Sequence, residues 1–241
     1  MQVKSSVIVL SSIKYNDTSN IVEVFSKEMG RVSFIVKIPK TSRAAVKRSL
    51  FQPMSLLELE WNHRLVSNLQ RIQSAKSYAP FVSLPYNPYK ASIALFLAEF
   101  LRSALHEEQA HASLYAYIES SVLWLDACER SFANFHLVFL IRMSRFLGFY
   151  PNLEGYEEGC YFDMLNSCFM KERPFHSHFV MPAEAARLPL LMRMNYETMR
   201  LFGFSRNERD RLIAFINNYY CLHIPNFPQL KSLDVLRELF S

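Results

Sequence analysis

The chain has 241 residues, of which 50% are hydrophobic, 20% are charged and five are glycine. This composition excludes a disordered chain, and the lack of any apolar run of about 18 residues excludes a predicted membrane-spanning helix. The net charge of +5 comes from the N-terminal third, because residues 1–80 carry 12 Lys and Arg against 5 Asp and Glu, which favours a polyanion-binding module joined to a neutral one.

The first 80 residues predict five strands. Three of them, "SVIVLSSIKY", "NIVEVFS" and "RVSFIVKI", are rich in β-branched and apolar residues, and residues 27–30 suit a hairpin turn that ends in Gly30. In "MSLLELEW" apolar residues alternate with glutamates, and "SNLQRIQSAKSY" supplies a fifth strand. Five short strands with one long connection after the third favour a Greek-key barrel, of which the OB-fold is the commonest five-stranded form.

The rest of the chain predicts helices. Pro80, Pro85 and Pro88 place a boundary near residue 80, and Asn87-Pro88 suits the start of a helix. Apolar stripes at helical spacing follow, and a later helix opens with the capping-box pair of Ser205 and Glu208. Residues 149–180 contain turn-forming residues and short alternating segments in place of helical stripes, and they predict a β-hairpin about residues 165–167. We therefore expect an α+β protein with an OB-fold domain over residues 1–80 and a helical domain over residues 81–241, the latter interrupted by the hairpin segment.

No motif for covalent chemistry occurs in the sequence. It has no G-x-x-x-x-G-K, G-x-G-x-x-G, H-E-x-x-H or G-x-S-x-G pattern, and its adjacent glutamate pairs point in different directions. The four cysteines are scattered, which indicates reduced thiols in a cytoplasmic protein, and the apolar run in residues 1–10 is too short to predict a secretion signal. We expect a protein that is not an enzyme and uses no cofactor.

A zinc site in the hairpin segment has to be weighed. Cys160, Cys168, His176 and His178 fall within nineteen residues. Structural zinc sites begin with paired ligands two to four residues apart, and His176 and His178 would point to opposite faces of a strand. The spacing therefore favours a metal-free hairpin.

A basic segment, "KIPKTSRAAVKRSLFQP" over residues 37–53, contains no acidic residue. Clustered cations of this kind neutralise nucleic-acid phosphates, and single-strand binders combine them with aromatic stacking platforms. We expect Phe34, on the strand that enters the loop, and Phe51, at its exit, to be those platforms. Lys27 and Arg31 are close in sequence and are counted as part of the same surface. The predicted DNA-binding residues are Lys27, Arg31, Phe34, Lys37, Lys40, Arg43, Lys47, Arg48 and Phe51.

The order of these features resembles the RecO family of bacterial recombination mediators. The resemblance rests on "VIVLSSIKYNDTSNIVEVFSKEMGRVSFIVK", the basic loop, "SLFQPMSLLELEW", "ALFLAEFL" and "FLIRMSRFLGFYPNL". It implies an OB-fold followed by a helical domain. Many family members carry two C-x-x-C pairs after the last of these elements, whereas this chain reads "EGYEEGCYFDMLNSCF" there and resembles a variant without zinc.

The resemblance also implies partners. Family members bind single- and double-stranded DNA, anneal complementary strands, and contact RecR and the acidic tail of single-stranded-DNA-binding protein, thereby helping RecA to load at gaps. It further implies a cytoplasmic, nucleoid-associated protein without a membrane partner. An acidic, aromatic-ended tail needs a hydrophobic groove flanked by cations. Arg142 and Arg145, which border an aromatic helix stripe, are candidates for that contact and are equally well read as ordinary surface arginines.

Two alternatives stay open from the sequence. In the first, the chain is an adaptor whose helical domain binds a protein while the basic loop only solvates the surface. In the second, it is an enzyme whose site is assembled from scattered residues. Salt-dependent DNA binding distinguishes the lead interpretation from the adaptor.

Overall fold

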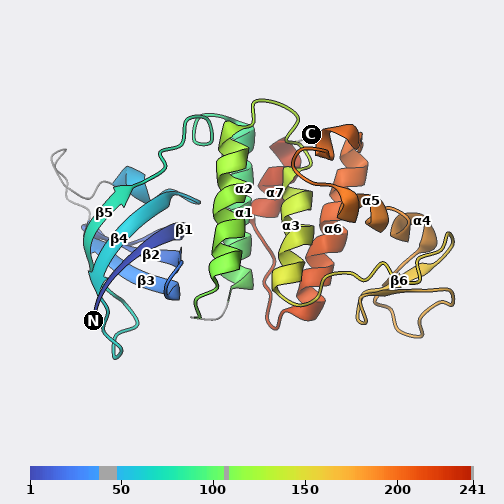
Figure 1. Ribbon diagram of the computed structural model, residues 1–241, viewed down its shortest axis with the longest axis horizontal. Coiled ribbons are helices and arrows are strands. Elements are labelled where there is room, and N and C mark those ends of the chain that lie inside the picture. The colour runs from blue at the N-terminus through green and yellow to red at the C-terminus, as the bar shows by residue number, and fades with distance from the viewer. Residues whose placement is uncertain (38–47, 106–108, 240–241) are drawn as a thin grey trace. The chain divides into compact units, whose positions relative to one another are not determined.

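The computed structural model describes residues 1–37, 48–105 and 109–239 (Figure 1). They form two compact units. Met1–Ala127 and Leu230–Leu239 make up the first unit, and Cys128–Gln229 make up the second. The chain thus leaves the first unit after residue 127 and returns to it for its last helix.

Five antiparallel strands form the core of the first unit. They are β1 (Gln2–Asn16), β2 (Ser19–Ser26), β3 (Gly30–Lys37), β4 (Leu56–Asn62) and β5 (Ile72–Ser77), in the order β3-β2-β1-β4-β5. The two edges of this sheet approach each other at Gln70, whose N–H donates to the Ser33 carbonyl at 2.8 Å and whose carbonyl accepts from Ile35 N at 2.9 Å. The bridge is parallel and closes the sheet into the strand order of an OB-fold, which confirms the predicted fold class.

Alternation along the strands builds the barrel interior. On β3, Val32, Phe34 and Val36 are buried in one core cluster with the inward residues of β4. The rings of Phe34 and Trp61 meet edge to face, with centroids 5.3 Å apart. Gly30 takes the predicted turn position with φ of 68°, a conformation that favours glycine.

Three helices complete the first unit: α1 (Pro88–Ala104), α2 (Ala112–Ala127) and α7 (Ser232–Leu239), and a short helix η1 (Arg48–Phe51) precedes β4. Asn87 caps α1 as predicted, because its side chain accepts from the backbone N–H groups of Tyr89 and Lys90. Glu99 of α1 accepts from Lys231 N at 3.1 Å and Ser232 N at 2.8 Å, and so caps the start of α7.

A cluster of hydrogen-bonded polar groups connects the proline-rich stretch to the end of α2. The Asp126 carboxylate accepts from the backbone N–H groups of Val82, Ser83 and Leu84 at 2.6 to 2.9 Å. The buried Lys90 ammonium donates to the Ser83 hydroxyl at 2.6 Å and to the Asp126 carbonyl at 2.9 Å. Burying these charges is tolerated because they are hydrogen-bonded.

The second unit is helical with a small sheet. Its helices are α3 (Phe135–Phe146), α4 (Pro182–Ala185), α5 (Leu188–Arg193), η2 (Met199–Leu201) and α6 (Arg206–His223). The sheet, in the order β7-β6-β8, consists of β6 (Tyr161–Asp163), β7 (Cys168–Met170) and β8 (Phe179–Val180). The hairpin predicted about residues 165–167 and the Ser205–Glu208 capping box are both confirmed.

The compact units do not coincide with residues 1–80 and 81–241, because α1, α2 and α7 share a unit with the barrel. The point at which the chain divides into independently folding domains stays a prediction. Among the described residues, no helix combines the length and apolar character that crossing a membrane needs.

Candidate nucleic-acid interface

The cations of the basic surface lie at two ends of β3. Lys37 is exposed at the end of the strand and pairs in register with Ser19 of β2. Lys27 is exposed in the turn that precedes β3. Seven residues separate the two ends of β3, which corresponds to about 24 Å of extended chain. Lys27 and Lys37 therefore do not belong to one cluster, and Lys40, Arg43, Lys47 and the side chain of Arg48 lie outside the described residues.

Arg31 is engaged within the first unit. Its guanidinium donates to Oε2 of Glu23 at 3.2 Å and to the carbonyls of Arg102 and Leu105, both at 3.1 Å. The last carbonyls of a helix have no partner within the helix, and a cation is favourable there. Arg31 thus fastens the end of α1 to the barrel. Three of its five N–H donors are thus used within the unit, while the side chain keeps 24% of its surface exposed, so a contact between Arg31 and DNA stays a prediction.

The burial of Phe34 and Phe51 contradicts the expectation that their rings stack on bases. Their exposed fractions are 0% and 2%, and both belong to the barrel core. Strand alternation turns Phe34 inward while Lys37, an odd number of residues away, points outward. Neither ring can stack on a base without unfolding the barrel.

The predicted DNA-binding residues do not include the connection between β4 and β5, although its cations add to the basic excess of the N-terminal third. At its tip Leu65 and Val66 are 94% and 100% exposed, and Arg64 and Arg71 flank them. The connection projects beyond the barrel beside the N-terminus (Figure 1), where His63 N donates to the Met1 carbonyl at 2.8 Å. A signal was present, because residues 61–77 contain no Asp or Glu.

Two hollows flank this connection. One of about 560 Å³ is shared with the start of β3, including Arg31 and Ser33, and one of about 410 Å³ is shared with Ile35 and the start of β5. Arg64, Ser67 and Gln70 line both hollows. Their walls offer amide, hydroxyl and guanidinium groups, which suit the polar edges of bases and the oxygens of phosphates.

The buried side chain of Gln70 fixes the connection. Its Oε1 accepts from Arg64 N at 2.9 Å, and its Nε2 donates to the carbonyls of Arg64 at 2.9 Å and Ser67 at 2.6 Å. The Ser67 hydroxyl donates to the Leu69 carbonyl at 2.7 Å. Backbone groups that would otherwise need water as a hydrogen-bond partner are satisfied within the connection. These bonds hold the tip in one shape.

In the second unit, the two predicted arginines differ. Arg142 is half-buried and its Nη2 donates to the Met194 carbonyl at 3.0 Å. Arg145 is exposed and lies over the ring of Tyr150, 4.6 Å from its centroid. Both lie on α3, but only Arg145 keeps its guanidinium at the surface.

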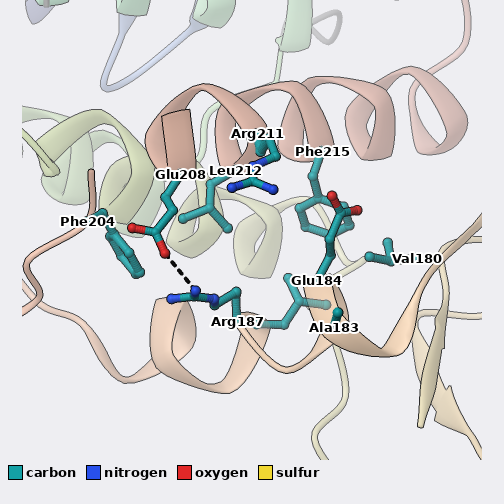
Figure 2. Close-up of a pocket in the computed structure, with 10 residues that line it drawn as sticks. Val180, Ala183, Glu184, Arg187, Phe204, Glu208, Arg211, Leu212 and Phe215 are labelled. Carbon is teal, nitrogen blue, oxygen red and sulfur yellow. Dashed lines mark ion pairs between the residues drawn. The ribbon is translucent and has the colours of Figure 1, made fainter. Parts of the chain in front are cut away.

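A pocket of about 230 Å³ lies between α6 and the segment of α4 and α5 (Figure 2). Arg187 and Glu208 form an ion pair at 2.6 Å across it, and Arg211 stands on the same side as Glu208. The Ser205 backbone N–H and then the Ser205 hydroxyl, both bonded to Glu208, hold the pKa of that carboxyl below its usual range, and Arg187 adds to this. The apolar residues that line the pocket are Val180, Ala183, Leu188, Phe204, Leu212 and Phe215.

The residues weighed as zinc ligands lie in and around the hairpin of β6 and β7. Asp163 is buried and accepts from Leu165 N at 2.8 Å and from both amide groups of Asn166. His176 Nε2 lies 3.3 Å from Asp163, and His176 Nδ1 accepts from His178 N. Asp163 and His176 are thus engaged at the turn, and no group of three or more His, Cys, Asp or Glu suited to a metal occurs in the part of the chain that the structure describes.

Comparison with known proteins covers the whole chain. Residues 1–81 match the family model for "Recombination protein O N terminal", and residues 85–234 match "Recombination protein O C terminal". A DNA repair protein RecO from Phocaeicola vulgatus is 61% identical over 234 residues, 97% of each chain. Proteins of the same name from Azobacteroides pseudotrichonymphae and Flavobacterium psychrophilum are 45% and 32% identical over 240 and 243 residues, covering each chain fully.

Proposed function

The chain belongs to the RecO family of DNA repair proteins, and from this premise we propose that it acts in DNA repair and recombination as a non-enzymatic mediator that binds single- and double-stranded DNA through its barrel. The observation that carries the proposal is the acid-free surface of the β4–β5 connection, where exposed Arg64 and Arg71 border two polar hollows. Lys37 adds an exposed cation at the far end of β3, and the basic residues that follow it in the sequence lie outside the described residues.

Annealing follows from the same charges. Two complementary strands repel each other because both are polyanions, and bound cations reduce that repulsion while the base edges stay free to pair. Such a mechanism needs no nucleotide and no covalent step. In this proposal the protein works with RecR and helps RecA to load at gaps that single-stranded-DNA-binding protein covers.

Fluorescence anisotropy of a labelled oligonucleotide across a salt series tests the proposal. We expect affinity for single strands to fall with salt by about 0.7 in log–log slope for each phosphate neutralised. Arg64→Glu with Arg71→Glu should lower that slope by about 1.4 and weaken binding at low salt. Joint reversal to Glu of Lys37, Lys40, Arg43, Lys47 and Arg48 should remove most binding.

A matched control is available in the second unit. Arg193 and Arg200 are exposed, and their reversal to Glu changes the net charge by the same amount as reversal of Arg64 and Arg71. The control should bind nearly as the parent does. Equal weakening by both pairs would mean that only net charge matters, and undiminished binding by all variants would favour the adaptor.

We further propose that the acidic tail of single-stranded-DNA-binding protein binds in the pocket of the second unit. An acidic peptide that ends in an aromatic residue needs an apolar cavity flanked by cations. Arg211 stands at a cavity lined by Phe204 and Phe215, which supports this location as an alternative to the expected Arg142 and Arg145. Arg187 at the same cavity is paired with Glu208, and Glu184 also lines it, so Arg211 is the cation that would meet the peptide carboxylates. Arg142 is occupied by the Met194 carbonyl.

Calorimetric titration with a labelled acidic peptide ending in Phe tests the pocket. Arg211→Glu should abolish binding, because the like charge would face the peptide carboxylates, whereas Arg145→Glu should leave binding unchanged. If Arg145→Glu abolishes binding and Arg211→Glu does not, the peptide binds on α3 instead.

A further inference from the structure

The tip of the β4–β5 connection exposes two neighbouring apolar side chains. Single exposed apolar residues are ordinary on protein surfaces. Here Leu65 and Val66 are adjacent, almost fully exposed and at the end of a projecting connection. None of the described residues of their unit covers them, so that part of the fold gives these two side chains no packing role.

The tip is held rigidly away from the barrel. Gln70 bonds to Arg64 and Ser67 on the two sides of the tip, and its own backbone pairs with Ser33 and Ile35 of β3. A backbone that is held by such bonds presents its side chains at a fixed place and lowers the ordering cost on binding. The pair Leu65–Val66 is therefore a fixed projection and does not fold back onto its neighbours.

The positive charge around the tip indicates which class of ligand would bind there. The tip lies between Arg64 and Arg71 in a stretch, residues 61–77, that has three Lys or Arg and no Asp or Glu. A ligand that offers apolar faces spaced along a chain of negative charges complements this arrangement. Nucleic-acid strands have that form, because flat bases alternate with phosphates. A basic or neutral protein surface would leave the arginines without partners.

We propose that Leu65 and Val66 act as a wedge that inserts between neighbouring bases of a bound DNA strand. Apolar side chains such as Leu open base steps in this way in other DNA-binding proteins. Arg64 and Arg71 hold the phosphates on either side of the opened step, and the hollows lined by Ser67 and Gln70 receive the displaced base edges. The inference rests on the proposed DNA binding and specifies how the strand is held.

The test uses an oligonucleotide that contains 2-aminopurine, whose fluorescence rises when it is unstacked. The full-length protein should raise this fluorescence at saturation, with saturation determined separately by anisotropy. Leu65→Ser with Val66→Ser should remove the rise and weaken binding about fivefold, the low end of what stacking on a side chain contributes per base. Gln70→Ala, which releases the wedge without altering it, should reduce the rise as well.

Val82 and Leu201 provide the control, since they are 81% and 74% exposed in other parts of the chain. Val82→Ser with Leu201→Ser should behave like the parent. The wedge is overturned if the parent saturates the oligonucleotide without a fluorescence rise, or if the Leu65→Ser, Val66→Ser protein gives the full rise. Failure of the parent to bind at all would instead overturn the proposed function. Thermal melting confirms that each variant is folded.

Discussion

Nη2 of Arg31 donates to Oε2 of Glu23 at 3.2 Å on the outer face of β2 and β3. The same oxygen accepts from Nε of Arg102 in α1 at 2.6 Å, and Phe25 of β2 packs near the ring of Tyr115 in α2. OB-folds often bind their ligands across strands 2 and 3. Helices cover part of that face here, and for this reason we propose that DNA binds at Lys37 and the β4–β5 connection instead.

Arg31→Ala should therefore affect stability and leave DNA affinity nearly unchanged. The substitution removes three hydrogen bonds, two of them to carbonyls at the end of α1, and we expect the free energy of unfolding to fall by about 2 kcal/mol. Urea denaturation measures the first effect and anisotropy the second. Lys27→Ala, in the exposed turn nearby, should leave stability unchanged. A large loss of affinity in folded Arg31→Ala protein would return Arg31 to the DNA-binding surface.

Phe34→Ala should destabilise the barrel by about 3 to 5 kcal/mol, because it leaves a cavity beside Trp61. Phe34→Leu keeps most of the volume, so it should cost less and bind DNA with the affinity of the parent. Chemical denaturation and anisotropy on the two variants separate packing from recognition. If Phe34→Leu were as stable as the parent and yet failed to bind, the ring would have a role outside the core.

Asp126 should contribute pH-dependent stability. Burial raises the pKa of its carboxyl, but the N–H groups of Val82, Leu84 and Ser83 outweigh burial and lower it overall. A carboxyl whose pKa is lower in the folded state stabilises fully above its unfolded pKa of about 3.9, and the contribution is lost as the pH falls through the folded value. Asp126→Asn should cost about 1 to 2 kcal/mol at pH 7.

The check is urea denaturation of the parent and Asp126→Asn at pH 7 and near pH 3. Other carboxylates titrate in both proteins, so the informative quantity is the difference between them. That difference should shrink at the lower pH. A constant difference would mean that the Asp126 charge does not stabilise the first unit.

The hairpin segment should be independent of metal. A chelator such as EDTA should leave the melting temperature of the parent unchanged. Asp163→Ala should lower it, because the N–H groups of Leu165 and Asn166 lose their partner at a cost of about 1 to 3 kcal/mol. Cys221→Ala, an exposed position on α6, serves as the comparison. A chelator-induced drop in melting temperature would show that the segment binds metal after all.

Local patterns predicted the strands, the turn at Gly30, the Asn87 cap and the Ser205–Glu208 box because each depends on residues close in sequence. The alternation of buried and exposed residues on β3 also argues against one of the predicted DNA contacts. Phe34 and Lys37 are three residues apart and so must point to opposite faces of the strand, which excludes a shared DNA contact.

Other features depend on contacts that no local pattern encodes. The engagement of Arg31 needs Arg102 and Leu105, more than 70 residues away, and periodicity does not position one element against another. The charge balance of residues 61–77 marked the β4–β5 connection as basic, but its fixed shape comes from the side-chain hydrogen bonds of Gln70. The pocket at Arg187 and Arg211 likewise joins segments that are separate in the sequence.

The capping of α7 by Glu99 has a consequence for biosynthesis. The two partners are 132 and 133 residues apart, and the entire second unit is translated between them. While the ribosome makes that stretch, the Glu99 carboxylate lacks the N–H groups that it will cap. The apolar side of α1 that packs against α7 is uncovered during the same time. A nascent chain arrested just before residue 230 should therefore bind chaperones through α1, whereas release of the last helix should end that association.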